Sequence, residues 1–114
     1  MYGILIYDGV EPIDLGATFG VLSIAKRIAP DLAFAGVAKS AGLVTCANGM
    51  QVVADHRFAD APDFDEIIVT GGPGWQEAAK DDATLDYLRG TNARISAICT
   101  GAMIVAAAGL LDGK

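Results

Sequence analysis

The chain has 114 residues, of which 53% are apolar and 19% are charged. This length and composition suit one globular domain and exclude a disordered segment. The 14 acidic residues outnumber the 8 basic ones, and no cluster of Lys and Arg stands out, so we expect no nucleic-acid binding by this segment. No apolar stretch is long enough for a membrane span and the first residues do not form a signal peptide, so we expect no membrane association and a cytoplasmic protein with reduced cysteines.

The first half of the chain predicts two strands, a helix and a hairpin. The apolar run at residues 2–7 and the segment 32–38 are typical of buried strands. Between them, apolar residues recur at helical spacing, and Pro30 stops the predicted helix. The residues at that spacing are Leu15, Phe19, Leu22 and Ala25. Asn48-Gly49 separates two β-prone runs, which predicts a tight hairpin turn.

The second half alternates strands with helices. Residues 66–70 predict a strand that runs into a GGPG loop at 71–74, and residues 95–98 predict the last strand. Helical segments follow each of them, at 75–89 with a break near Asp81-Asp82, and from Thr100 to Gly109, with a turn at Asp112-Gly113. This order predicts an α/β fold, a three-layer αβα sandwich around a mostly parallel sheet with one β-hairpin.

Cys99 is the strongest candidate for a catalytic residue. Ligands of open parallel sheets bind outside the carboxyl ends of the strands, and Cys99 lies where the last predicted strand turns sharply into an alanine-rich helix. Such a turn presents a nucleophile in the manner of a nucleophile elbow, and the helix start favours a thiolate. The alternative is that Cys99 is a small buried apolar residue.

The GGPG loop and the residues after Cys99 are candidates for binding the substrate. Glycines after a strand allow close approach of a ligand, and no Lys-Ser/Thr pair makes this a Walker loop. We expect the N–H groups of Gly72 and Thr100 to form an oxyanion hole beside the sulfur, with Gly71 and Gly101 in the same substrate-binding region.

Asp14 is the candidate acid. Its apolar neighbours Pro12, Ile13 and Leu15 suggest that it points inward, where a carboxyl close to a thiolate could donate a proton. The alternatives are a plain helix cap or helix-dipole partner, and Glu11 as the acid, although Glu11 looks more exposed. His56, the only histidine, is expected to be a surface or strand-end residue, and Cys46 a strand residue.

Three segments give the chain a family resemblance: ILIYDGVEPIDLGA, IIVTGGPG and AICTGAMIVAAAGLLDGK. They resemble the ThiJ/PfpI superfamily, whose flavodoxin-like fold is related to class I glutamine amidotransferase domains. The last segment is most similar to isocyanide (isonitrile) hydratases, and equally to the amidase-like sensor domains of AraC-type regulators. The resemblance implies that Cys99 is the nucleophile, Asp14 the acid that meets it, Thr100 a hydrogen-bonding neighbour and Gly72 an oxyanion-hole residue.

The resemblance also implies that the domain is incomplete. Residues 1–114 correspond to about the N-terminal two-thirds of a single domain of this family, whose C-terminal strands and occasional histidine would come later. One departure is Gly16-Ala17-Thr18, where many relatives have Gly-Pro.

The leading functional hypothesis is a cysteine-dependent lyase of the isocyanide hydratase type. It would convert a small isocyanide and water into an N-substituted formamide, without metal or organic cofactor. The alternatives are the ligand-sensing domain of a transcription regulator, glyoxalase or deglycase chemistry, amidase or protease chemistry, and a reactive but non-catalytic thiol. The resemblance further implies a homodimer, for which the apolar first helix would suit the interface.

Overall fold

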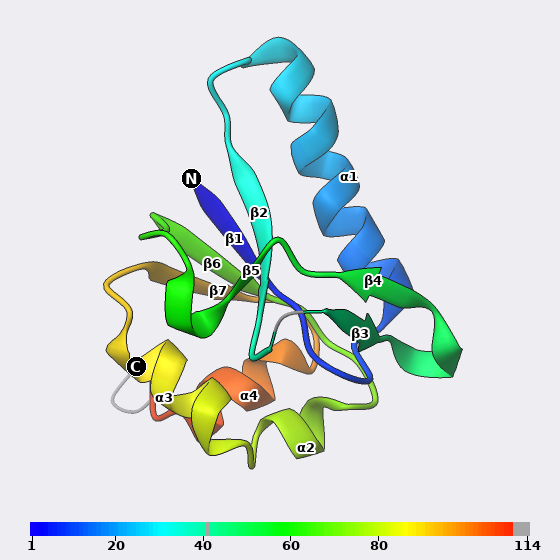
Figure 1. The fold of residues 1–114 in the computed structure, drawn as a ribbon, viewed down its shortest axis with the longest axis vertical. Coiled ribbons are helices and arrows are strands. Elements are labelled where there is room, and N and C mark those ends of the chain that lie inside the picture. Colours follow the sequence, from blue (N-terminus) through cyan, green and yellow to red (C-terminus); the bar gives the residue numbers. More distant parts are fainter. Residues whose placement is uncertain (41, 111–114) are drawn as a thin grey trace.

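The computed structural model describes residues 1–40 and 42–110 (Figure 1). The predicted turn at Asp112-Gly113 lies outside these residues. Two short 3-10 turns, Ala47–Gly49 and Phe58–Asp60, accompany the main elements. In chain order these are β1 (Tyr2–Leu5), α1 (Pro12–Ile28), β2 (Phe34–Ala38), β3 (Leu43–Thr45), β4 (Gln51–Val53), β5 (His56–Arg57), β6 (Glu66–Val69), α2 (Trp75–Ala78), α3 (Asp82–Gly90), β7 (Arg94–Ala97) and α4 (Gly101–Ala107).

Five parallel strands form the central sheet, in the order β5-β2-β1-β6-β7. In the middle, β1 pairs with β2 through Tyr2 and Phe34 and with β6 through Tyr2 and Glu66. Helices cover both faces of β1 and β6, so the apolar side chains of these two strands are buried in the core. Leu5 and Val69, for example, are fully buried. The order β2-β1-β6-β7 is the flavodoxin-like one, and the strand order reverses between β1 and β6.

The hairpin stands apart from this sheet. Strands β3 and β4 form a separate antiparallel pair. Asn48 and Gly49, with φ of 63° and 98°, make the turn between them, and Asn and Gly are the residues that adopt this left-handed conformation at least cost. The hairpin predicted at Asn48-Gly49 is therefore confirmed, as a small second sheet.

Helices cover both faces of the central sheet (Figure 1). The long helix α1 lies on one face, while α2, α3 and α4 gather on the other, where α4 contacts β6 and β7. The predicted break at Asp81-Asp82 separates α2 from α3, because the Asp81 side chain accepts a hydrogen bond from the Thr84 N–H and caps α3. The three-layer α/β sandwich is confirmed.

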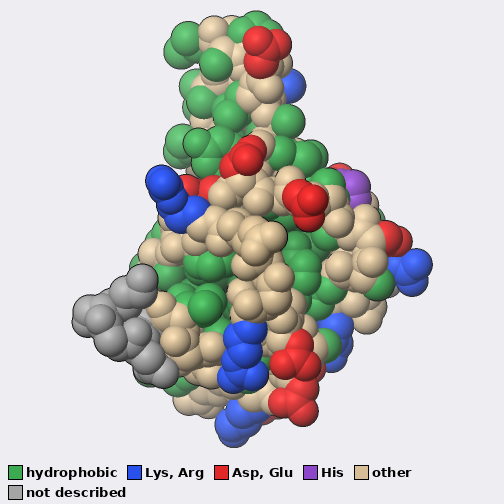
Figure 2. All heavy atoms as spheres, turned by 90° about the vertical axis from the view of Figure 1, so that its left-hand side faces the viewer, with side chains coloured by type: hydrophobic (Ala, Val, Ile, Leu, Met, Phe, Trp, Pro, Cys, Tyr) green, Lys and Arg blue, Asp and Glu red, His purple; other side chains and the backbone are tan. Residues whose placement is uncertain are grey.

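Helix α1 is only partly covered by the rest of the described chain. Leu15 and Leu22 are its buried residues, whereas several large apolar side chains are exposed. These are Ile13 at 73%, Phe19 at 48%, Val21 at 66%, Ile24 at 58% and Ile28 at 85%. Hydrophobic side chains therefore cover much of the projecting upper part of the molecule (Figure 2). No helix in the described ranges combines the length and the apolar character that a membrane crossing requires.

Candidate active site

The candidate site lies at the carboxyl ends of β1, β6 and β7. The connection from β1 to α1 and the GGPG loop after β6 meet at the point where the strand order reverses, which is where flavodoxin-like sheets bind ligands. The two segments hold each other through main-chain bonds. The Glu11 N–H donates to the Gly71 carbonyl at 2.9 Å, and the Gly74 N–H donates to the Gly9 carbonyl at 3.0 Å.

Cys99 occupies the sharp turn between β7 and α4. Its φ is +52°, a left-handed conformation that is uncommon for a residue other than glycine. The turn closes because the Gly101 N–H donates to the Ile98 carbonyl at 2.9 Å. Cys99 is exposed, so it is not the buried apolar residue of the alternative interpretation. A strained, exposed residue at a strand-to-helix junction is the geometry of a nucleophile elbow.

Glycine is required at 101 by the packing of this turn. A Cβ placed there would lie 2.2 Å from the Val69 carbonyl oxygen, which belongs to the backbone of β6. Only a residue without a side chain lets α4 start so close to the sheet. Gly101 therefore positions Cys99 through packing.

Gly71 and Gly72 pack directly against the elbow. A Cβ at Gly71 would lie 3.1 Å from the Cys99 Cβ and 2.9 Å from the Thr100 nitrogen. The Gly72 N–H donates to Thr100 Oγ1 at 3.1 Å. We expected the N–H groups of Gly72 and Thr100 to form the oxyanion hole. In the structure, the Gly72 N–H is instead engaged by the Thr100 hydroxyl. Within residues 1–40 and 42–110, the Gly71 and Thr100 N–H groups have no hydrogen-bond acceptor.

Asp14 lies in the first turn of α1 and is half-buried. The pKa of Tyr7 is raised, mainly by burial and further by the negative charge of Asp14. Among the described residues, no hydrogen bond joins the Asp14 carboxylate to the Cys99 thiol.

Glu11 has a structural role at the same helix end. It is the N-cap of α1, and its Oε2 accepts a hydrogen bond from the Ile13 N–H at 3.4 Å. Glu11 and Asp14 are both half-buried. The Glu11 carboxylate turns back over the start of the helix, as an N-cap does.

The second cysteine and the histidine lie outside this arrangement. Cys46 was expected on a strand, but it follows the end of β3 and caps the turn at Ala47–Gly49, where it is 2% exposed. Burial raises the pKa of its thiol, and the charges of Asp8 and Glu11 raise it further. His56 lies on β5 with its ring against Phe64, at a centroid distance of 6.5 Å, which agrees with a strand residue.

Sequence reasoning missed Tyr7 and Thr70. The Tyr7 hydroxyl donates to the Thr70 carbonyl at 2.8 Å, and Tyr7 is 8% exposed and Thr70 fully buried. The two residues look like the ends of two apolar strands. The sequence does place a polar residue at the end of each apolar run. Only the pairing of β1 with β6, however, shows that these two residues meet.

These features define a class of α/β proteins: a flavodoxin-like sheet with a sharp strand-to-helix turn, here at Cys99, packed against a glycine loop. Over residues 3–114 the chain matches the DJ-1/PfpI family. The chain therefore belongs to the DJ-1/PfpI family.

Two kinds of curated relative are similar to it. An isonitrile hydratase from Pseudomonas putida is 35% identical over 115 residues, which cover 98% of this chain and 49% of the hydratase. The HTH-type transcriptional regulator GbdR from Pseudomonas aeruginosa is 38% identical over 72 residues, or 61% of this chain and 20% of the regulator. The chain thus spans about half the length of the hydratase.

Solved structures agree on the fold. A ThiJ/PfpI family protein from Pseudomonas syringae has a TM-score of 0.80 and 31% identity, over 98% of this chain and 47% of that one. A DJ-1 superfamily protein from Salmonella typhimurium has a TM-score of 0.82 at 22% identity, over 98% of this chain and 62% of that one. The fold of this chain is therefore the one that these solved structures have.

Proposed function

We propose that this chain carries the nucleophile-elbow site of a cysteine-dependent lyase that hydrates a small isocyanide to an N-substituted formamide. The observation that carries the proposal is Cys99, an exposed thiol held at φ +52° on a strand-to-helix turn. The similarity to an isonitrile hydratase, at 35% identity over 98% of this chain, supports the choice of reaction.

The chemistry needs a nucleophile, a proton and water. The Cys99 thiolate attacks the terminal carbon of the isocyanide, and the carbon takes a proton, which gives a thioimidate bound through sulfur. Water then adds to the same carbon. The C–S bond breaks, the formamide leaves, and the thiolate and the proton are recovered, so the sum is one isocyanide plus one water.

The surrounding residues support these steps. The Gly71 and Thr100 N–H groups, beside the Cys99 Cβ, are the donors for charge that develops on the substrate, above all on the oxygen added from water. Asp14 is the proposed proton donor and acceptor, because it comes from α1 at the same switch point. Sulfur and backbone N–H groups supply this chemistry by themselves, and the proposal assigns no metal or organic cofactor.

The test is an assay of this chain with an alkyl isocyanide such as n-butyl isocyanide, with formamide measured by NMR. We expect turnover by the wild-type chain and by the buried-thiol control Cys46→Ala, and none by Cys99→Ala. Asp14→Asn should lose most of the activity, because general acid–base groups contribute roughly 10²–10⁴-fold. Equal formamide production by wild type and Cys99→Ala would falsify the proposal.

The second candidate function is the ligand-sensing domain of a transcription regulator. It is favoured by the 38% identity to GbdR, which extends over 61% of this chain. A sensor would bind a small ligand without converting it. Thermal stabilisation by a ligand, together with no turnover of any isocyanide, would favour this function over the lyase.

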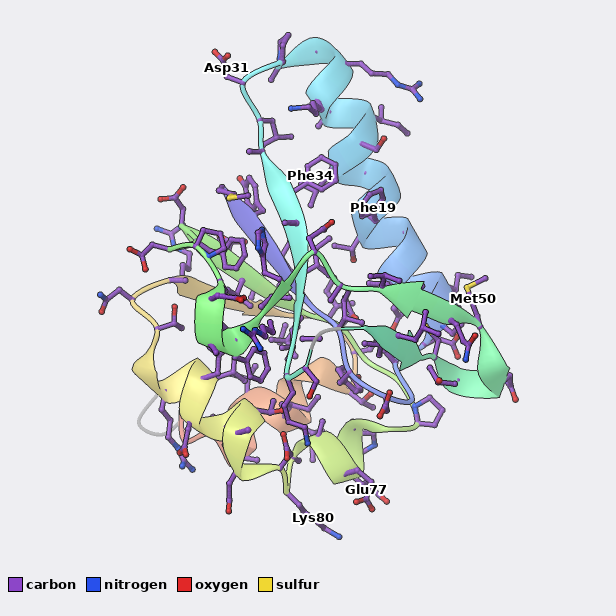
Figure 3. The ribbon with its side chains drawn as sticks, viewed as in Figure 1. Phe19, Asp31, Phe34, Met50, Glu77 and Lys80 are labelled. Carbon is purple, nitrogen blue, oxygen red and sulfur yellow. The ribbon has the colours of Figure 1, made fainter. Side chains whose placement is uncertain are left out.

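We also propose that the protein works as a homodimer in the cytoplasm, where Cys99 stays reduced. The exposed apolar side chains of α1 support the dimer, and so does an apolar cavity of about 290 Å³ between α1 and the hairpin. Phe19 and Met50 line that cavity, and Phe19 also stacks edge-on against Phe34 at 5.1 Å (Figure 3). Light scattering tests this: we expect a dimer for wild type and a monomer for Ile24→Lys. A monomeric wild type would contradict the dimer, and a dimeric Ile24→Lys would contradict an interface at α1.

A further inference from the structure

The Tyr7 hydroxyl is a buried polar group that the proposed chemistry does not use. It donates to the Thr70 carbonyl at 2.8 Å, across 63 positions of the sequence. Tyr7 lies just beyond β1 and Thr70 just beyond β6, so this one bond joins the ends of the two strands at the switch point. Thr70 is the residue before the GGPG loop.

The direction of the next N–H group follows from the geometry of the strand. The Val69 carbonyl accepts a hydrogen bond from the Ile98 N–H at 2.9 Å, so it points toward β7. Successive carbonyls of an extended strand alternate in direction, so the Thr70 carbonyl points toward β1, where Tyr7 meets it. The peptide bonds of the described residues are trans. In a trans peptide the N–H points opposite to the C=O, so the Gly71 N–H points to the β7 side.

Cys99 follows β7, so the elbow lies on that side. Gly71 packs against the elbow, with its Cβ position 3.1 Å from the Cys99 Cβ. Its N–H has no acceptor within the part of the chain that the structure describes. A donor that is held in place, unused and next to a nucleophile is what stabilises charge in a transition state.

We propose that Tyr7 is a positioning residue for the reaction at Cys99: by holding the Thr70 carbonyl, its hydroxyl fixes and polarises the 70–71 peptide so that the Gly71 N–H is aimed at the charge developing on the substrate. The inference rests on the proposed function and deepens it. Polarisation adds to positioning, because a hydrogen bond to the C=O of a peptide makes its N–H a stronger donor.

Two observations agree with a permanent role for this hydroxyl. Tyr7 is 8% exposed, so water does not compete for its hydrogen bond. Burial and the nearby Asp14 charge raise the pKa of Tyr7, so the phenol keeps its proton and remains a donor throughout the range in which a Cys99 thiolate can work.

The experiment compares Tyr7→Phe with Tyr87→Phe in this chain. Tyr87 is a matched control, because it stacks on Phe58 at 4.2 Å, away from the elbow. Using n-butyl isocyanide, we expect Tyr7→Phe to lower kcat about tenfold, a fraction of the roughly 10²–10³-fold that loss of a whole oxyanion-hole donor costs. The KM should stay within twofold, and so should the rate at which iodoacetamide alkylates Cys99. Tyr87→Phe should match wild type.

A second measurement needs no substrate and separates this inference from the proposed function. In amide NMR spectra, the Gly71 resonance should move in Tyr7→Phe and stay in place in Tyr87→Phe. Wild type should also show a slowly exchanging Tyr7 hydroxyl proton. If Tyr7→Phe does not fold, a rapidly exchanging hydroxyl proton in wild type overturns the inference.

If wild type hydrates no isocyanide, the proposed function fails, and a shifted Gly71 resonance still supports the positioning role. An unmoved Gly71 resonance, or a Tyr7→Phe variant with wild-type kcat in an active protein, overturns the inference. A loss of alkylation rate equal to the loss of kcat also overturns it, because the hydroxyl would then act on the thiol.

Discussion

The Gly72 amide donates to Thr100 Oγ1 at 3.1 Å, and this bond links the GGPG loop to the elbow across 28 positions of the sequence. One side chain therefore sets the distance between the two segments that form the site. It also occupies the Gly72 N–H, whereas the Gly71 and Thr100 N–H groups have no acceptor among residues 1–40 and 42–110.

The first prediction concerns this bond. Thr100→Val keeps the shape of the side chain but removes the acceptor, so the Gly72 N–H loses its partner. We expect a loss of about 0.5–1.5 kcal/mol in the free energy of unfolding, measured by urea denaturation, together with a fall in kcat. Thr100→Ser keeps the acceptor and serves as the control. Equal stability of the Val and Ser variants would contradict the assignment.

The second prediction concerns backbone strain at Cys99. An L-residue pays about 1–2 kcal/mol for the left-handed conformation, and glycine does not. At an ordinary position glycine is less stabilising than alanine by about 0.5–1 kcal/mol, but at φ +52° the order should reverse. We expect Cys99→Gly to unfold at a higher urea concentration than Cys99→Ala. The opposite order would show that the turn carries no strain at this residue.

The third prediction concerns the two thiols. Cys99 is exposed, whereas Cys46 is 2% exposed, and the pKa of Cys46 is raised by burial and by Asp8 and Glu11. Thiolate is the reactive form, so an aromatic disulfide reagent should titrate one fast thiol and one slow thiol in the native chain. Cys99→Ala should remove the fast phase and Cys46→Ala the slow one. Two thiols with equal rates would argue against an elbow that presents Cys99.

The fourth prediction concerns the close approach of α4 to the sheet. Gly101→Ala would place a Cβ 2.2 Å from the Val69 carbonyl oxygen, so the backbone would have to move. We expect the free energy of unfolding to fall by at least about 1–3 kcal/mol. The matched control is Gly16→Ala in α1, where no atom lies within 4 Å of the new Cβ. That variant should gain about 0.5–1 kcal/mol. Thermal or urea unfolding of both variants decides it.

The fifth prediction concerns pH and Asp81. The pKa of Asp81 is lowered from its ordinary value of 3.8, first by the hydrogen bond from the Thr84 side chain and also by Lys39. A folded-state pKa below the unfolded one means that the stabilisation is present above about 3.8 and is lost as the pH falls through the folded pKa. Wild type should therefore lose more stability between pH 6 and pH 3 than Asp81→Asn does.

The control for that experiment is Asp82→Asn, at the neighbouring exposed position in the first turn of α3. It should keep the pH dependence of wild type. At pH 7, replacing Asp81 by Ala should cost about 0.5–2 kcal/mol, the usual value of an N-cap. An Asp81→Asn variant whose stability follows wild type at every pH would show that the cap does not carry this dependence.

The sequence by itself determined the elements and their class. Buried parallel strands need apolar side chains on both faces, so the runs at 2–7, 66–70 and 95–98 marked β1, β6 and β7 closely. Local chemistry marked the hairpin at Asn48-Gly49, because few residues tolerate its positive φ. The same local logic placed Cys99 on a turn between strand and helix.

Only the tertiary structure decided which groups of the site meet. The Gly72 N–H was expected in the oxyanion hole, but in the structure it donates to Thr100 Oγ1 at 3.1 Å. Tyr7 bonds to Thr70 because β1 and β6 are neighbours in the sheet. Hydrogen bonds between residues far apart in sequence depend on strand order and register, and neither is written in local composition. The spacing of the sequence could therefore point to Cys99, while the pairing of the strands decided which backbone groups pack against it.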